Sequence, residues 1–481
     1  MTPSRRHPRA ATPLILTMAL LLSGGAAAQS SPGADDAVNL TRAYELAVAS
    51  MPTIAERRAL EQAAEARVDQ ALSQRLPRID ADATYTDSAY ETTTRSIDPS
   101  TGRPVEQLDT TNEESYRYGL NLIQPIYDRE VSTGIAEARS RRTLATRETT
   151  ATETRLAGQV AESYLRILRA REALRLAKAE RRAYQLRVEQ MQQRLARGLA
   201  SRIDVLDGRV RADEARTAIV QARNELELAR LDLERLTGTR IEQLLGASPE
   251  RTELSRPPEA SRVDALQTTA GQENPAVTVA LAEQALADRT TASRRAAFFP
   301  RLSLQARYSD TNATDQLVQG EDRRIYLSLE VPLFSGGQRS AGVDEALARE
   351  QAARARTRER RRQAVIETRR LANEQRNAYE RVRTARQSLE TAKAQLNANE
   401  QGLDAGVRDL VEVLDARARL FGIRRDLSEA TYDYLISKVQ LQTVSGGFDY
   451  ESLRSLDTRY LNRSIDLTKA IEADAAGRSA E

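Results

Sequence analysis

Acidic residues and arginines occur in a short pattern that the chain contains twice. The segment IDVLDGR at residues 203–209 has a near copy, VEVLDAR, at residues 411–417. The carboxylates of the two segments are those of Asp204, Asp207, Glu412 and Asp415. If several copies of the chain surround an axis, each position becomes a ring of carboxylates, and such a ring at a narrow opening selects cations. Arg408, and secondly Arg202, could then latch the opening by pairing with these acids.

A structural role explains part of the same pattern. Each segment follows a glycine and a possible helix-capping residue, namely Gly198 with Ser201 and Gly406 with Asp409. An acid three residues after such a cap predicts a capping box, which would account for Asp204 and Glu412. Asp207 and Asp415 lie one turn further along, where a cap cannot use them so directly. The two arginines are also explained as solvated turn residues, so the sequence leaves both interpretations open.

Both segments begin the second helix of a predicted coiled-coil hairpin. Apolar residues recur at alternating steps of three and four for more than four heptads, which is strong evidence for coiled coil. The first helix of each hairpin is expected from about 130 to 196 and from about 338 to 404, or roughly 100 Å at about 1.5 Å per residue. The hairpin tips then fall near 198–202 and 404–409.

Four stretches in which apolar and polar residues alternate predict β-strands. The strands are expected at about 79–87, 114–125, 301–310 and 323–333, with polar loops at about 87–113 and 310–322. About ten residues is the length that a tilted transmembrane strand requires. Four strands cannot close a water-filled barrel, because open edges in lipid leave backbone groups unpaired, so several protomers would have to contribute. An ordinary half-buried sheet is the alternative interpretation.

The chain aligns with itself over two halves, which predicts an internal two-fold sequence repeat. Pro52 and Pro77 of the first half align with Pro275 and Pro300 of the second. The predicted parts are a first repeat at 29–237, an equatorial linker at 238–262, a second repeat at 263–445 and a C-terminal equatorial segment or tail at 446–481. The predicted fold class is α+β, with four transmembrane β-strands and two long antiparallel coiled-coil hairpins in each protomer.

Composition narrows the class of protein. Residues 1–28 are typical of a secretory signal peptide, with three arginines, a short apolar run and an A-x-A site. The formal charge of +3 equals these three arginines, so the rest of the chain is near neutral and no nucleic-acid partner is indicated. Cysteine is absent, and the single histidine, His7, lies in the signal. We therefore expect no metal site, no cofactor and no enzymatic activity.

The chain resembles the TolC family of bacterial outer-membrane efflux and secretion channels over essentially its whole mature length. The resemblance rests on the two halves, Asn274 and Pro275, the strand ends QP at 124–125 and VP at 331–332, and most specifically on GVRDLVEVLDAR at 406–417. It implies a homotrimer whose twelve strands form one barrel in contact with outer-membrane lipid, continued by a helical tunnel in the periplasm. It also implies a passive exit channel for efflux or type I secretion of small molecules or proteins, with a periplasmic membrane-fusion adaptor and an inner-membrane transporter as partners.

The resemblance also assigns roles at the tips. Carried over by position, the gate would involve Asp204, Arg408, Glu412 and Asp415, and an adaptor would contact Gly198, Leu199, Ala200, Ser201, Gly406, Val407 and Asp409. Glu412 stands where the family has Asp, Asp409 where it has Thr, and Leu403 where it has a gate tyrosine, so Arg408 would need another partner. The alternative is a periplasmic coiled-coil adaptor or scaffold without a pore. An adaptor should carry one hairpin beside other modules, and a soluble scaffold should lack the strands and the signal.

Overall fold

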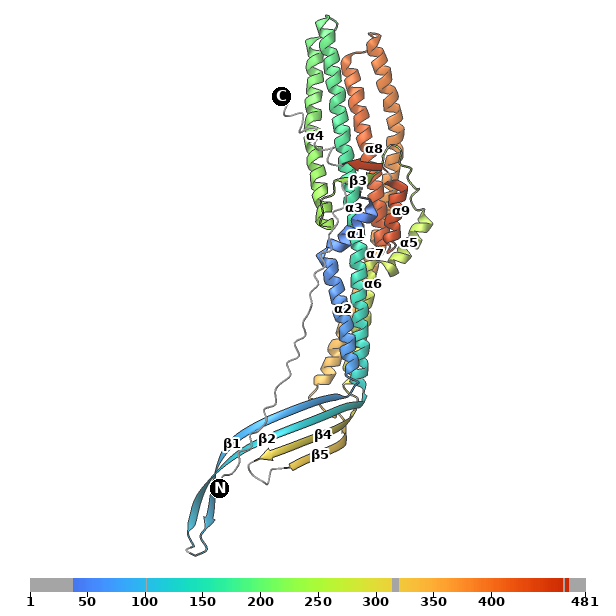
Figure 1. Cartoon of the computed structure of the whole chain (residues 1–481). Coiled ribbons are helices and arrows are strands. Elements are labelled where there is room, and N and C mark those ends of the chain that lie inside the picture. Colours follow the sequence, from blue (N-terminus) through green and yellow to red (C-terminus); the bar gives the residue numbers. More distant parts are fainter. Residues whose placement is uncertain (1–37, 101, 314–319, 462, 467–481) are drawn as a thin grey trace, which may run out of the picture. The chain divides into compact units, whose positions relative to one another are not determined.

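The computed structural model describes residues 38–100, 102–313, 320–461 and 463–466. The predicted signal peptide at 1–28 lies outside the described residues, as does the end of the C-terminal segment from 467 onward. Within the described ranges, the chain is mostly helical and also contains two antiparallel sheets (Figure 1).

The same order of elements occurs in the two halves of the chain. The first half contains α1 (Leu40–Ser50), α2 (Pro52–Ser73), β1 (Arg78–Ile97), β2 (Pro104–Asp128), α3 (Arg129–Ala196) and α4 (Arg202–Thr237). The second half contains α5 (Ala260–Glu273), α6 (Pro275–Ala296), β4 (Arg301–Ala313), β5 (Gly320–Glu330), α7 (Gln338–Asp404) and α8 (Leu410–Val444). Between and after the halves lie β3 (Gln243–Gly246), α9 (Tyr450–Tyr460) and β6 (Arg463–Asp466).

Helices α3 and α7 are the longest, with 68 and 67 residues, which corresponds to roughly 100 Å each. Each packs antiparallel against the helix that follows it, and their predicted apolar seam is buried, for example at Leu156, Val160 and Leu174. Helix α3 also packs along α8, so the two hairpins lie side by side (Figure 1). Within the described ranges, none of the helices has both the length and the apolar character that crossing a bilayer requires.

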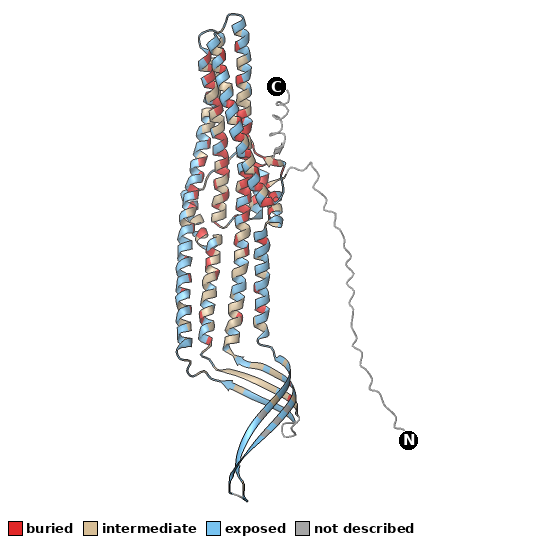
Figure 2. Cartoon of the chain, turned by 90° about the vertical axis from the view of Figure 1, so that its left-hand side faces the viewer, coloured by how far each residue is buried: buried red, intermediate tan, exposed pale blue. Residues whose placement is uncertain are grey.

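Four strands form one antiparallel sheet in the order β1-β2-β4-β5, so β1 and β5 are its edges. The central pair, β2 and β4, runs from Ser115 opposite Ala313 to Asp128 opposite Arg301, with a shift in register between Pro125 and Tyr127. Large apolar side chains of this sheet are exposed, among them Ile79 at 67%, Ile325 at 79% and Leu327 at 63%. Figure 2 shows almost no buried residue in the strands, so neither face of the sheet is covered by a core within one chain.

The strands of the first half are longer than the sequence predicts. The loop expected at about 87–113 is largely strand, because β1 continues to Ile97 and β2 begins at Pro104, and the amide of Asp98 donates to the carbonyl oxygen of Arg103 between them. The run of threonines at 92–94 favours extended backbone, since β-branched residues fit strands. These residues are polar on both faces, so they give no apolar alternation from which a strand can be predicted.

The second hairpin of strands differs from the prediction at its ends. The loop expected at about 310–322 is shorter, because β4 runs to Ala313 and β5 begins at Gly320. Strand β5 ends at Glu330 instead of continuing to about 333, since Pro332 has no amide hydrogen to donate to a ladder.

The segment at 238–262 and the C-terminal segment pack around the middle of the long helices. Strand β3 pairs with β6 in the second sheet. The hydroxyl of Tyr164, on α3, donates a hydrogen bond of 2.6 Å to the carbonyl oxygen of Leu245. Asp457 of α9 accepts hydrogen bonds from the backbone amides of Leu40 and Thr41 at 2.8 and 2.9 Å, and so fastens the start of α1. These contacts tie both chain ends of the described region to the hairpins.

Two helix junctions connect the hairpins to the helices nearer the large sheet. At the first, where α4 ends beside the junction of α1 and α2, the hydroxyl of Ser50, the last residue of α1, donates to the carbonyl oxygen of Leu236 at 3.3 Å. At the second, where α8 ends beside α6, the amide of Asn274 donates to the carbonyl oxygen of Val444 at 2.8 Å. Asn274 also accepts from two amides in the first turn of α6, at 2.9 and 3.3 Å. Asn274 therefore caps one helix and holds the end of another.

Candidate functional site

The first hairpin tip joins α3 to α4. Gly198 has a φ of 72°, a left-handed conformation that glycine adopts without strain. Ser201 caps α4, because its hydroxyl oxygen accepts from the amide of Asp204 at 3.1 Å. The carboxylate of Asp204 accepts in return from the amide of Ser201 at 2.7 Å, so the capping box predicted here is confirmed. The carboxylate of Asp204 is directed at its own helix start.

The second hairpin tip joins α7 to α8 and has a similar backbone, with Gly406 at a φ of 74°. Asp409 caps α8 by accepting from the amide of Glu412 at 2.9 Å. The carboxylate of Glu412 does not return this bond; it accepts from Nη1 of Arg408 at 2.9 and 3.0 Å. The predicted capping box is thus right for Asp409 and wrong for the side chain of Glu412, because the neighbouring guanidinium binds that carboxylate.

Ion pairs connect the two hairpins near their tips. Asp415 of α8 accepts from Nη2 of Arg211 on α4 at 2.9 Å. Asp404, at the end of α7, accepts from Nη2 of Arg194 on α3 at 3.1 Å. Sequence reasoning missed Arg211, Arg194 and Asp404, because they lie outside the repeated segments. Only the packing of the two hairpins against each other brings these charges together.

An apolar cluster underlies these ion pairs. Tyr184 and Val205 of the first hairpin pack with Leu410 and Leu414 of the second. Leu403 packs against the same cluster, so the residue at the position of the family's gate tyrosine belongs to the apolar core of the tips. Burial and the nearby Glu180 raise the pKa of Tyr184 to about 12.

Arginines from both hairpins crowd together beside this cluster. Nε and Nη2 of Arg187 are buried and have no hydrogen-bond partner among the described residues. Burial and the positive charges of Arg417 and Arg194 lower the pKa of Arg187. Arg417 itself is bound to Glu400 and to the carbonyl oxygen of Ala183. The packed tips therefore hold like charges close together as well as opposite ones, and the two effects oppose each other.

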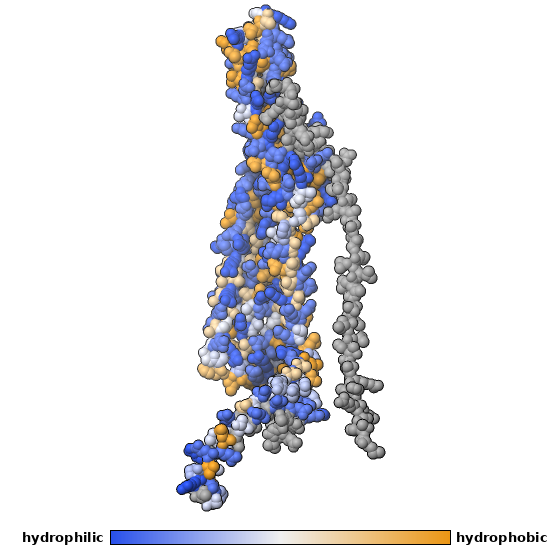
Figure 3. All heavy atoms as spheres, turned by 60° about the vertical axis from the view of Figure 1, so that its left-hand side comes forward, coloured by the Kyte–Doolittle hydropathy of each residue, from blue (hydrophilic) through white to orange (hydrophobic). Residues whose placement is uncertain are grey.

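The other predicted site residues lie at the surface of the tips. Asp207 is half-buried and Arg202 is exposed, and neither has an ion-pair partner in the part of the chain that the structure describes. Leu199 is 72% exposed and Val407 76% exposed, whereas Ala200 is half-buried against the apolar cluster. On the face seen in Figure 3, apolar side chains gather near this end of the hairpins. Within the described ranges, no group of three or more His, Cys, Asp or Glu side chains could hold a metal ion.

Comparisons with known proteins agree on one family. The chain matches a protein-family model described as outer membrane efflux protein over residues 43–239 and 266–447. It is 29% identical over 410 residues to the outer membrane protein TolC of Vibrio cholerae serotype O1, an alignment that covers 82% of this chain and 92% of that protein. It is 26% identical over 353 residues to the alkaline protease secretion protein AprF of Pseudomonas aeruginosa, covering 73% of each.

Solved structures show the same fold. The crystal structures of CusC include a chain that matches with a TM-score of 0.71 at 19% identity, covering 85% of this chain and 93% of that one. The outer membrane protein VceC from Vibrio cholerae matches with a TM-score of 0.67 at 20% identity, covering 85% of this chain and 97% of that one.

The matched residues make up most of the chain, so the chain belongs to the outer membrane efflux protein family. It is an outer-membrane exit channel for efflux or type I secretion, with the fold of TolC-like channels. The family, the outer-membrane location and the channel function predicted from the sequence are confirmed.

Proposed function

We propose that three copies of the chain form one channel, in which their sheets close a twelve-stranded transmembrane β-barrel. The observation that carries this proposal is the large sheet, whose apolar side chains are exposed and whose edge strands β1 and β5 have no partner among the described residues. In lipid, an open edge leaves backbone amides and carbonyls unpaired. Pairing of β1 with β5 of the next copy would satisfy both edges and leave the apolar face toward the bilayer.

A second exposed surface supports the same assembly. Besides its buried seam, α4 carries apolar residues at helical spacing on an outer face, and these are Ile203, Leu206, Val210, Val220, Leu228 and Leu231. A second apolar seam on a helix predicts a second helical neighbour. In the proposed trimer this neighbour belongs to the next copy, so the hairpins of three copies enclose a tunnel in the periplasm. The repeated order of elements supports an origin of the two halves as an internal repeat.

The gate of this channel is proposed to lie at the hairpin tips. The ion pair between Arg211 and Asp415 ties the second hairpin to the first, and its loss would let the tips separate. Around a three-fold axis, Asp207 and Asp415 would form acidic rings that favour cations, with Glu412 close by. Asp204 would act mainly as a helix cap. Arg408 and Arg202 are exposed, which makes them candidates for latch contacts between copies.

The same tips are proposed to receive the partners of the channel. Exposed Leu199 and Val407 offer apolar contacts to a coiled-coil hairpin of a periplasmic membrane-fusion adaptor. Gly198, Ala200, Ser201, Gly406 and Asp409 would complete this contact. The adaptor would join the channel to an inner-membrane transporter, which supplies the energy, while the channel conducts small molecules or proteins passively to the exterior.

Cysteine cross-linking tests the assembly, because the natural chain contains no cysteine. One cysteine replaces Ala83 on β1, and a second replaces Ile325, Leu327 or Leu329 on β5 in turn. Oxidation of outer membranes should give covalent trimers with at least one of these pairs. Moving the first cysteine to Leu120, on the central strand β2, should abolish the cross-link. Recovery of the protein as a monomer in the soluble periplasm would contradict the proposal.

A further inference from the structure

A cavity of about 680 Å³ lies where α3, α6 and α7 meet, far from the hairpin tips. Its floor is formed by small apolar residues, including Ala151 and Ala280. Its walls carry three arginines, Arg155 from α3 and Arg356 and Arg360 from α7. This space, called the basic cavity below, has the volume of a typical small-molecule site.

The arginines of the basic cavity keep most of their hydrogen-bonding capacity free. Arg155 and Arg356 have no hydrogen bond or ion pair with any residue that the structure describes. Arg360 donates to the side-chain oxygen of Gln363 at 3.1 Å. Of the two acids in the lining, Glu359 is already bound to an arginine outside it, Arg362. The guanidinium groups are therefore the donors available to a ligand.

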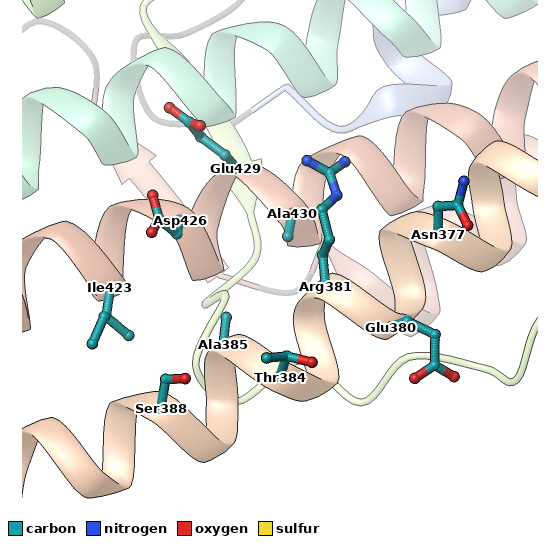
Figure 4. Close-up of a pocket in the computed structure, with 10 residues that line it drawn as sticks. All are labelled: Asn377, Glu380, Arg381, Thr384, Ala385, Ser388, Ile423, Asp426, Glu429 and Ala430. Carbon is teal, nitrogen blue, oxygen red and sulfur yellow. The ribbon is translucent and has the colours of Figure 1, made fainter.

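The basic cavity shares one face of α7 with a second hollow. Gln363 and Arg381 are eighteen residues apart, which is about five full turns, so their side chains point the same way. Arg381 lines a groove of about 640 Å³ between α7 and α8 (Figure 4), called the acidic groove below. In that groove Asp426 and Glu429 have no ion-pair partner among the described residues, whereas Arg381 is bound to Asp433 at 2.9 Å. The two hollows along α7 thus differ in charge, with free arginines of α3 and α7 in the basic cavity and free carboxylates of α8 in the acidic groove.

This face points away from the segment at 238–262. Arg386 of α7 donates to the carbonyl oxygen of Thr252 in that segment. Thr384 and Ser388, which line the acidic groove, are each two residues from Arg386 and so about 200° around the helix. If the segment at 238–262 lies on the outside of the tunnel, the basic cavity and the acidic groove lie on its inner wall.

We propose that the basic cavity binds an organic anion, a carboxylate or sulfonate with a small apolar body. The planar guanidinium of arginine pairs with such groups through two parallel hydrogen bonds. The alanines of the floor accept the apolar part of the ligand. That the bound anion is cargo in passage through the channel rests on the proposed function, whereas the binding itself does not.

Equilibrium dialysis tests the site with radiolabelled 2-naphthalenesulfonate as the probe. The full-length protein is used in lipid nanodiscs, and empty nanodiscs serve as the blank. The double variant Arg155→Gln and Arg356→Gln should bind the probe at least about tenfold more weakly, since each charge-assisted hydrogen bond contributes more than a neutral one. The matched variant Asp426→Asn and Glu429→Gln, in the acidic groove, should bind it as the natural protein does. A trimethylammonium analogue of the probe should not compete.

A variant at Glu283 should gain affinity for the probe, and misfolding cannot produce such a gain. The carboxylate of Glu283 lines the basic cavity and has no ion-pair partner in the described ranges. Glu283→Gln should therefore bind the sulfonate a few times more tightly, because a repelling charge is removed. Equal affinity of the natural protein and the double arginine variant, or equal binding of the cationic analogue, would overturn the proposal. Neither result would contradict the channel proposal, because the dialysis measures binding of the probe and not conduction.

Discussion

The two hairpin tips share a backbone but differ in how their charged side chains pair. Gly198 and Gly406 both end a long helix in the left-handed conformation. At the first tip Asp204 bonds back to the helix start, whereas at the second tip the equivalent Glu412 bonds to Arg408. Arg408 aligns with Ala200, which packs on the apolar cluster, so the first tip has no cation at this position. The acid of the first tip thus completes a cap, whereas the acid of the second tip forms an ion pair.

Asp207 and Asp415, one helix turn further along, also differ in whether they form an ion pair. Asp415 is paired with Arg211, while its counterpart Asp207 has no ion-pair partner among the described residues. The first hairpin therefore supplies the cation and the second the carboxylate of their shared ion pair. The two halves therefore share the backbone of their helix starts and differ in the ion pairs that their charged side chains form.

The largest expected effect concerns the ends of α4 and α8 that lie away from the tips. The hydrogen bonds at these two ends also differ between the halves. Asn274→Ala removes three hydrogen bonds that cap α6 and hold α8, and should lower the free energy of unfolding by about 2 kcal/mol. Ser50→Ala removes a longer bond to Leu236 and should lower it by about 0.5 kcal/mol. Chemical denaturation followed by circular dichroism measures both. Asn274→Asp, which keeps the cap and loses the donor, should fall between them.

The shared backbone of the tips predicts equal losses from a second pair of variants. Gly198→Ala and Gly406→Ala each force a side chain into the left-handed region and should each cost about 1 kcal/mol. Gly134→Ala is the matched control, because Gly134 lies inside α3 with open space around it and should be neutral or stabilising. A loss at only one tip would show that the two backbones are not equivalent in solution.

A smaller difference in stability is expected between variants of Asp204 and Glu412, the acids that follow the two caps. Asp204→Ala opens the capping box and should lower stability by roughly 0.5 to 1 kcal/mol. Glu412→Ala removes an exposed ion pair with Arg408, which precedes the start of α8, and should cost about 0.5 kcal/mol at most. In channel recordings the order of the effects should reverse. Glu412→Ala and Arg408→Ala should change conductance more than Asp204→Ala does. The same order in both measurements would mean that both acids serve only as caps.

Patterns that are local in the sequence predicted much of the fold. The heptad seam led to the long hairpins, because residues such as Val160 and Leu174 repeat on one helical face. The cap at Ser201 followed from a spacing of three residues. Strand alternation located the large sheet but missed the ribbon formed by 88–97 and 104–113, since most of its residues are polar and its few apolar ones do not alternate regularly.

Contacts between distant segments could not be predicted in this way. Arg211 and Asp415 are 204 residues apart, and no local pattern marks them as partners. Asp457 and the amide of Leu40 are 417 apart, so the fastening of α1 by α9 depends on tertiary packing alone. The gate hypothesis named Asp415 from its place in the repeated segment, but the sequence could not name the cation that pairs with it.

Single-channel recording of a charge reversal at Arg211 and Asp415 tests the proposed gate most directly. Arg211→Asp or Asp415→Arg alone replaces the 2.9 Å ion pair with two like charges that face each other in the packed tips, and either should open the tips and raise conductance in planar bilayers several-fold. The double variant restores opposite charges with the positions exchanged and should return conductance to that of the natural protein. Natural conductance in both single variants, or an equally open channel in the double variant, would contradict a gate held by Arg211 and Asp415.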